Sequence, residues 1–369
     1  MGSTGGAEVE DPAACSWVHP LPLEFPDRSS LLRSDDLLVW YGWSVDEALL
    51  VIRGVDAVTG VEVFNHTSSL DVPPRAGTVA GGRLFIPVGD QILAFDLTTH
   101  ALSDSGYVHS PAGVSEPLSQ VVYRALTTLD SGDIIAVMQS SGEFGGSQLN
   151  WARYGDAPQP LWRHDVDNQY GATEAAWTNT LIADEGPFHI ISGMYQAFGG
   201  FDGPYMPYPW GRRFDSTTGE PLDGLFGEFE SSGENYAHIF SCMGFVEDNV
   251  LATITSLTPS VYALEYPDPP YLGILDLWSP EGDRLSTQQL PGGFCSFGRH
   301  PDVGSFIRVT SLSDDDANVS NVLRLHADGS TVQVVEDTIR RLGNVVVSPD
   351  SSIALLQWDP ASICRVEVD

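Results

Sequence analysis

Short apolar runs of strand length alternate with turn-forming residues along the whole chain. The run Ala48–Ile52 precedes Asp56, the run Val61–Phe64 follows the same turn, and the run Gln91–Phe95 precedes Asp96. Apolar runs of about 4 to 8 residues that are bounded by Asp, Gly and Pro are typical of strands. The pattern therefore predicts an all-β protein.

Seven aspartates at turn positions divide the chain into units of similar length. In the sequence Asp-x-x-Thr-Gly, the Asp side chain bonds the backbone two residues on and Gly supplies a positive φ, which favours a turn between strands. The aspartates are 40 to 61 residues apart, as expected for four-stranded propeller blades with insertions. We predict a seven-bladed β-propeller; the alternative is an all-β protein with unrelated turns. The aspartates are Asp56, Asp96, Asp156, Asp215, Asp276, Asp328 and Asp369.

The end of the chain predicts how the ring closes. Arg299–Asp302 and Val347–Asp350 indicate turns between first and second strands. A second strand over Ile353–Trp358 and a third over Ile363–Val368 then follow. Because an unpaired sheet edge invites aggregation, we expect the N-terminal segment Ser16–Phe25 to supply the fourth strand and complete the C-terminal blade.

The four cysteines fit this closure. It places Cys15 beside Cys364, while Cys242 and Cys295 fall in the innermost strands of adjacent blades. Of the three pairings that four cysteines allow, the topology selects Cys15–Cys364 and Cys242–Cys295. Disulfides would indicate an oxidising compartment; the alternative is four buried thiols.

Residues 1–14 have the composition of a flexible leader, and residues 15–369 form a single propeller domain in this interpretation. The leader is similar to the tether behind the lipidated cysteine of bacterial lipoproteins, with Met1 at the position of that cysteine. An ordinary disordered terminus is the alternative. We therefore expect an extracytoplasmic protein of the periplasm or cell surface, with a lipid anchor as one means of attachment.

The charge excludes several kinds of partner and chemistry. The formal net charge is −33, and all 17 basic residues are arginine. The absence of lysine excludes Schiff-base catalysis, and the negative charge disfavours nucleic acids and anionic membranes as partners. The sequence has no apolar run long enough for a transmembrane helix.

The candidate binding site lies on one face of the predicted propeller. The Asp turns keep one face short, whereas the long segments fall on the opposite face, which we call the long-loop face. The segment Met194–Arg213 has six aromatic residues in a Gly/Pro frame. Tyr, Trp and Arg dominate binding interfaces, so we expect this segment to bind a protein or a glycan; the alternative is that its rings pack down as a cap. The candidate residues are Tyr195, Phe198, Phe201, Tyr205, Tyr208, Trp210 and Arg212.

The sequence offers one candidate metal site and no candidate catalytic site. Asp314, Asp315 and Asp316 are hard oxygen donors suited to Ca²⁺, but their spacing is not that of an EF-hand, and a solvated loop tip is the alternative. No other cofactor is expected, and no catalytic residue is assigned, because common nucleophile, zinc and phosphate-binding motifs are absent. The alternative function is a carbohydrate-active hydrolase or lyase, or an oxidoreductase, with acidic residues at the channel mouth.

The Asp-x-x-Thr-Gly turns and apolar runs such as Arg83–Asp96 resemble the PQQ-like and YncE-like propellers of secreted bacterial proteins. The turn Ser348–Asp350 is similar to that of TolB-type propellers. The resemblance implies the fold and an extracytoplasmic bacterial protein. It implies no cofactor site, because no unit shows a regular Trp after Thr-Gly.

Overall fold

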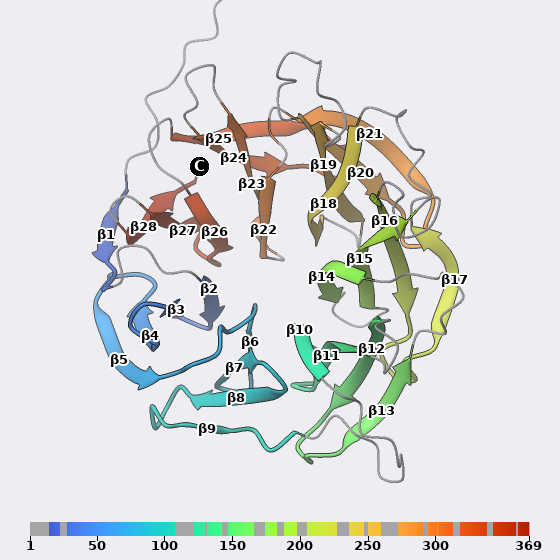
Figure 1. Cartoon of the computed structure of the whole chain (residues 1–369). Coiled ribbons are helices and arrows are strands. Elements are labelled where there is room, and N and C mark those ends of the chain that lie inside the picture. Colours follow the sequence, from blue (N-terminus) through green and yellow to red (C-terminus); the bar gives the residue numbers. More distant parts are fainter. Residues whose placement is uncertain are drawn as a thin grey trace, which may run out of the picture.

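The strands of the protein form a ring of antiparallel sheets (Figure 1). In this computed structural model the strands are hydrogen-bonded into seven four-stranded sheets. The structure describes residues 15–22, 28–107, 121–129, 131–141, 147–165, 174–182, 188–197, 205–226, 236–246, 250–259, 272–290, 292, 294–300, 302–312, 318–337, 342–358 and 361–368.

The first three sheets follow the chain order. The first sheet contains β2 (Arg28–Ser34), β3 (Leu37–Ser44), β4 (Leu49–Asp56) and β5 (Glu62–Ser69). The second contains β6 (Thr78–Ala80), β7 (Arg83–Val88), β8 (Gln91–Asp96) and β9 (Leu102–Asp104). The third contains β10 (Val121–Thr128), β11 (Ile134–Ser141), β12 (Ser147–Tyr154) and β13 (Pro160–Asp165).

The next three sheets repeat this pattern. The fourth contains β14 (Glu174–Ile182), β15 (Phe188–Ala197), β16 (Tyr205–Phe214) and β17 (Pro221–Phe226). The fifth contains β18 (Tyr236–Phe245), β19 (Leu251–Pro259), β20 (Leu272–Trp278) and β21 (Arg284–Leu290). The sixth contains β22 (Phe294–His300), β23 (Gly304–Leu312), β24 (Asn318–Leu325) and β25 (Thr331–Asp337).

The remaining sheet, which we call the closing sheet, joins the two ends of the chain. It contains β26 (Leu342–Val347), β27 (Ser352–Trp358), β28 (Ala361–Glu367) and β1 (Trp17–Pro20), in the order β1-β28-β27-β26. The N-terminal strand therefore pairs with the last strand, as predicted, but it ends at Pro20 and does not extend to Phe25. Because Pro20 and Pro22 cannot donate backbone hydrogen bonds, they end the ladder; residues 23–27 lie outside the described part.

Apolar clusters between neighbouring sheets hold the ring together. The first strand of each sheet lies at the centre and contacts the adjacent sheets, with β26 against β2 at the closure. One cluster joins Trp40 and Leu38 of the first sheet to Leu356 and Ile363 of the closing sheet. Because side chains from two sheets fill each space, each sheet depends on both of its neighbours for burial.

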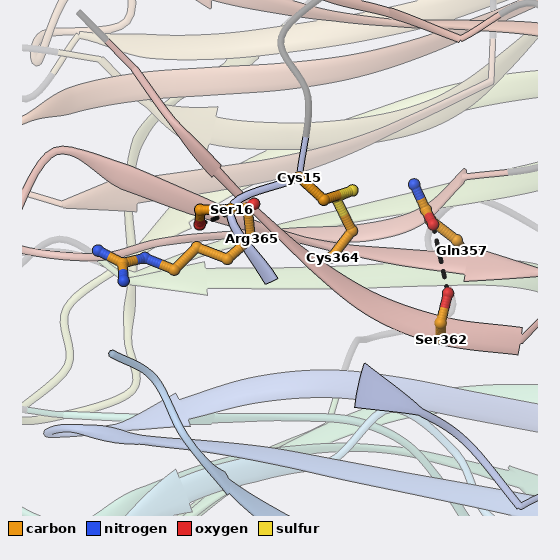
Figure 2. Close-up of a disulfide and its surroundings, with 6 residues drawn as sticks. All are labelled: Cys15, Ser16, Gln357, Ser362, Cys364 and Arg365. Carbon is orange, nitrogen blue, oxygen red and sulfur yellow. Dashed lines mark hydrogen bonds between the residues drawn. A yellow bond between two sulfur atoms is a disulfide. The ribbon is translucent and has the colours of Figure 1, made fainter. Parts of the chain in front are cut away.

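Both predicted disulfides are confirmed. Cys15 and Cys364 have Cα atoms 5.5 Å apart and tie the chain start to β28 (Figure 2). Cys242 of β18 and Cys295 of β22 have Cα atoms 5.7 Å apart and join the fifth and sixth sheets. Two disulfides indicate an oxidising, extracytoplasmic environment.

One of the predicted turn aspartates, Asp276, lies within a strand, and another, Asp369, lies outside the described residues. Asp276 lies within β20, is only 2% exposed, and accepts a hydrogen bond of 2.5 Å from the Thr287 hydroxyl. The turn of this sheet lies beyond it, where the Ser279 N–H donates to the Asp283 carbonyl. The prediction was wrong there because the strand continues through Trp278, and Ser279 replaces Asp as the residue that caps the turn.

The Asp-x-x-Thr-Gly turn of the first sheet is bound by side chains of the closing sheet. The Trp17 Nε1–H donates to the Val58 carbonyl at 3.1 Å, and Arg365 donates to the same oxygen at 2.9 Å. Arg365 also pairs with Asp350 at 2.6 Å. Gly60 has a φ of 70°, and a Cβ there would lie 2.7 Å from the Trp17 ring. We call this contact the closing junction.

The corresponding turn of the fourth sheet is bound by the same two residue types of the third sheet, at the carbonyl one residue after its Asp215 and not two residues after it as at Asp56. Trp162 Nε1 and Arg153 donate to the Ser216 carbonyl at 3.3 and 2.9 Å. Arg153 also pairs with Asp133. A Cβ at Gly219, whose φ is 76°, would lie 2.6 Å from the Trp162 ring. We call this the internal junction; its tryptophan precedes the next sheet's turn, which is why a search for Trp after Thr-Gly misses it.

Candidate functional site

The longest described strands of the ring belong to the fourth and fifth sheets. Strands β15, β16 and β18 each have ten residues, whereas β7 and β8 of the second sheet have six. The connections between second and third strands end at this face, and the one between β19 and β20 covers residues 260–271. The fourth and fifth sheets therefore contain the longest of the described strands.

The predicted aromatic segment is mostly a hairpin and not a long loop. Tyr195 lies in β15, and β16 already begins at Tyr205. The two strands pair without a break, from Phe188 with Phe214 to Ala197 with Tyr205. Prolines at alternate positions of β16 remain compatible with this pairing, since a proline removes one donor without changing the extended conformation. The interpretation of the whole segment as an insertion was therefore wrong.

The register divides the candidate residues between the two faces of the fourth sheet. Successive residues of a strand alternate between faces, so Tyr208, Trp210 and Arg212 share one face, and Tyr205 lies on the other. Tyr195 pairs with Pro207 and therefore shares the face of Tyr205. Phe198 and Phe201 lie outside the described residues. The binding role of these residues stays a prediction.

Strand β16 ends in a packed layer against the third sheet. Phe214, its last residue, is fully buried, and its ring centroid lies 4.4 Å from that of Trp151. Trp151 in turn donates to the Gly219 carbonyl at 3.1 Å. Tyr208, Trp210 and Arg212 occupy alternate positions of β16 before this packed layer.

A second feature lies at the opposite end of the ring. A cavity of about 720 Å³ is lined by the inner strands β2, β22 and β26 and by their short turns, including Arg33, Asp36 and His300. Arg33 donates to the carbonyls of Asp35 and Val347, at 2.6 and 3.1 Å. Burial lowers the pKa of Arg33, and nearby carboxylates oppose that shift. Arg33 therefore fastens β26 to the first turn.

The sequence contained a signal for this cavity that we did not use. The turns at Arg299–Asp302 and Val347–Asp350, which were recognised only as turns, contribute several of its lining residues. Both turns precede second strands, so their residues meet at the same end of the channel. The position of these two turns within the repeat would have identified the residues that line the cavity.

The turn aspartates have a structural role. Hydrogen bonds from the Thr59 backbone N–H and hydroxyl hold the pKa of Asp56 below its ordinary value. The Thr218 N–H does the same for Asp215. A carboxylate that accepts several donors stays ionised at neutral pH, so these side chains act as fixed acceptors in turns.

The predicted calcium ligands Asp314, Asp315 and Asp316 lie outside the described residues. Within the described part of the chain, no group of three or more His, Cys, Asp or Glu side chains is arranged to hold a metal ion. The described residues also include no helix that is long and apolar enough to span a membrane.

The fold is shared with proteins of varied activity. No protein-family model matches the chain, and no curated protein matches it in sequence. A polysaccharide lyase of family PL25, an ulvan lyase, is similar over 97% of this chain and 95% of its own, with 10% identity and a TM-score of 0.59.

Two further structures have the same fold. A quinohemoprotein alcohol dehydrogenase from Pseudomonas putida HK5 matches 96% of this chain and 76% of its own, with 11% identity and a TM-score of 0.53. BamB from Moraxella catarrhalis matches 96% and 99%, with 12% identity and a TM-score of 0.50. These likenesses confirm the predicted resemblance to bacterial β-propellers at the level of the fold.

Proposed function

We propose that the protein is an extracytoplasmic binding or scaffold propeller that recognises a protein or a glycan through its long-loop face. The observation that carries this proposal is the asymmetry of the ring. Strands β15, β16 and β18 are the longest described strands and adjoin the long-loop face, while the described turns at the other face are short and held by side-chain hydrogen bonds. Rigid scaffolds commonly present binding residues in this way.

The β15–β16 hairpin supplies the recognition residues in this proposal. Its register gives one face three consecutive alternate positions occupied by Tyr208, Trp210 and Arg212. Residues fixed in a paired strand lose little backbone entropy when they bind, and Trp, Tyr and Arg are the commonest hot-spot residues. Such a row suits a sugar ring or an apolar side chain of a protein.

The partner class can be decided by parallel experiments. We expect the purified protein to bind either immobilised polysaccharides, with ulvan among them, or a protein that is cross-linked to it on intact cells. Trp210→Ala should weaken that binding by about 2 kcal/mol, or roughly 30-fold. Val332→Ala is the matched control, because Val332 is 55% exposed on the sixth sheet.

Thermal melting distinguishes recognition from packing. If Trp210 serves recognition, the melting temperature of Trp210→Ala should stay close to that of the parent. If Trp210 instead packs the hairpin against the third sheet, the substitution should cost about 3 to 5 kcal/mol of stability. A large loss of stability would therefore contradict the proposal.

A second candidate is cleavage of a polysaccharide. It is favoured by the similarity to the ulvan lyase, which covers almost the whole of both chains. A lyase leaves unsaturated sugar ends that absorb ultraviolet light. Incubation with ulvan and other uronate polymers, followed by absorbance, tests this candidate; binding without new absorbance supports the binding function.

For location, we propose the periplasm or the cell surface, with residues 1–14 as the tether. The disulfides support an oxidising compartment. Protease treatment of intact cells should degrade a surface protein and spare a periplasmic one, and globomycin-type inhibition of lipoprotein processing should change its mass only if it is lipid-anchored.

A further inference from the structure

Arg308 is a buried cation without a counterion in the described part of the chain. It lies in the middle of β23, its Nε atom is enclosed, and that atom has no hydrogen-bond partner there. Of the arginines in the described ion pairs, Arg153 and Arg365 each contact an aspartate. In a protein with a net charge of −33, an arginine left without a carboxylate is unexpected.

The guanidinium of Arg308 stays charged at neutral pH. Burial lowers its pKa to about 10, which is still well above neutral. The residue as a whole is half-buried, while its Nε is enclosed. A buried charge is costly unless it is paired, and water alone does not neutralise it.

The neighbours of Arg308 form a polar layer above an apolar one. Arg308 lies two residues after Phe306 on the same face of β23, and Phe306 packs in one apolar cluster with Val345 and Leu355 of the closing sheet. Ser296 of β22 pairs directly with Arg308. Beyond it, the hydroxyls of Thr310 and Ser320 are 3.1 Å apart.

The closing sheet also presents neutral polar groups on the face directed at the sixth sheet. The Ser362 hydroxyl donates to Gln357 at 3.2 Å, beside the Cys15–Cys364 disulfide (Figure 2). Gln357 shares its face with Leu355 through strand alternation. The face of the closing sheet directed at the sixth sheet therefore carries a hydroxyl and an amide besides its apolar residues.

We propose that Arg308 is the centre of an anion-binding site between the sixth sheet and the closing sheet. The ligand is a small monovalent anion, either a halide or a carboxylate, held by the guanidinium and neighbouring hydroxyls. The bound anion supplies the missing charge and fastens the sixth sheet to the sheet that closes the ring. Arginine binds such anions through its fixed fork of donors.

The melting temperature in different salts tests the site. With sodium fluoride as the reference at constant ionic strength, chloride, bromide or acetate should raise the melting temperature by about 2 to 4 °C, and the rise should saturate. Arg308→Met should abolish this rise. It should also melt no lower than the parent in the reference salt, because it removes an unpaired buried charge. Arg284→Met, at an exposed arginine, should keep the full anion response.

Crystallography identifies the ligand. Crystals soaked in bromide should show an anomalous peak within hydrogen-bond distance of the Arg308 guanidinium, and acetate soaks distinguish a carboxylate from a halide. A water molecule alone at this position would overturn the proposal. An equal salt response in the parent and Arg308→Met would also overturn it.

An internal counterion is tested by a second variant. Asp337 lies on the outer strand β25, and its backbone pairs with Ser320 of β24, two residues from Val322, which pairs with Arg308. If Asp337 neutralises Arg308, the parent should be insensitive to anions, and Asp337→Asn should become sensitive. That result would contradict the proposal, whereas an anion response in both proteins supports it.

Discussion

The closing and internal junctions each hold an Asp-x-x-Thr-Gly turn with a tryptophan and an arginine. Only the closing junction also joins the two ends of the chain. At each junction a tryptophan and an arginine donate to one carbonyl of the turn, and the arginine pairs with an aspartate of its own sheet. At the internal junction, Trp162 follows Arg153 along a continuous hairpin. At the closing junction, Trp17 and Arg365 come from opposite ends of the chain.

This difference explains the position of the long-range disulfide. Cys15 is two residues before Trp17, and Cys364 is next to Arg365. The disulfide therefore keeps Trp17 and Arg365 together at the closing junction. At the internal junction the continuous backbone keeps Trp162 and Arg153 together. The same contacts require an additional constraint wherever the backbone does not hold the donors together.

The largest expected effect comes from removing that constraint. Cys15→Ser with Cys364→Ser should lower the free energy of unfolding by about 5 to 6 kcal/mol in the loop-entropy model, because the bond closes a loop of 349 residues. The Cys242–Cys295 loop of 53 residues should contribute less, about 4 kcal/mol. Denaturant unfolding of the two double variants measures both, and a larger loss at the shorter loop would contradict the comparison.

Replacing the glycine at either junction should have the next largest effect. Gly219→Ala should cost about 2 to 4 kcal/mol, since alanine is strained at a φ of 76° and its Cβ would also meet Trp162. Gly60→Ala should behave similarly against Trp17. Gly106→Ala is the control, because Gly106 has a φ of 73° with open space around its Cβ. If all three variants lose equal stability, the tryptophan contact contributes nothing.

Acid should weaken the closing junction. Partial burial opposes ionisation of Asp350, but hydrogen bonds from Ser352 and the charge of Arg365 outweigh it and hold the Asp350 pKa below its ordinary value. A lowered pKa stabilises the fold above the unfolded value, near pH 4, and this contribution disappears as the pH falls through the folded value. Because Asp350 is substantially exposed, the effect should be below about 1 kcal/mol. Melting temperatures from pH 6 to pH 2.5 should fall less steeply for Asp350→Asn than for the parent.

The smallest effect is expected in the second sheet, where the turn has no tryptophan above it. His100 occupies the glycine position with a φ of 57°, and its ring lies 4.6 Å from Phe64. His100→Gly should change stability by less than about 1 kcal/mol, because relief of backbone strain offsets the lost ring contact. His100→Ala keeps the strain and loses the ring, so it should be the less stable of the two by thermal melting.

The turn repeat predicted strand order and pairing because it is a local signal. Asp56 and Asp215 each determine a turn with their own backbone, and the position of β1 followed from the number of strands needed to cover an edge. Asp276 misled the prediction because an aspartate within a strand looks the same in sequence as one that ends it. Burial against Thr287 depends on a neighbouring strand that the local pattern does not specify.

The candidate site was only partly predictable for a similar reason. The composition of Met194–Arg213 identified an unusual segment, but Gly and Pro made it resemble a loop. Pairing of β15 with β16 overrides that preference and separates Tyr205 from Trp210 by register. Arg308 gave no signal at all, because isolation of a charge depends on the sheets on both sides of it.

The closing sheet also sets an order of events during synthesis and export. Trp17 leaves the ribosome before Arg365, which lies more than three hundred residues later in the chain. Until then the Val58 carbonyl lacks its Arg365 donor, and the apolar face of the first sheet around Trp40 lacks the residues of the closing sheet that cover it. Contacts between distant parts of a chain form slowly and leave apolar surface open to aggregation. Strand β1 is therefore made well before β28, the strand it pairs with, and it takes its place where an oxidant is available to join Cys15 to Cys364.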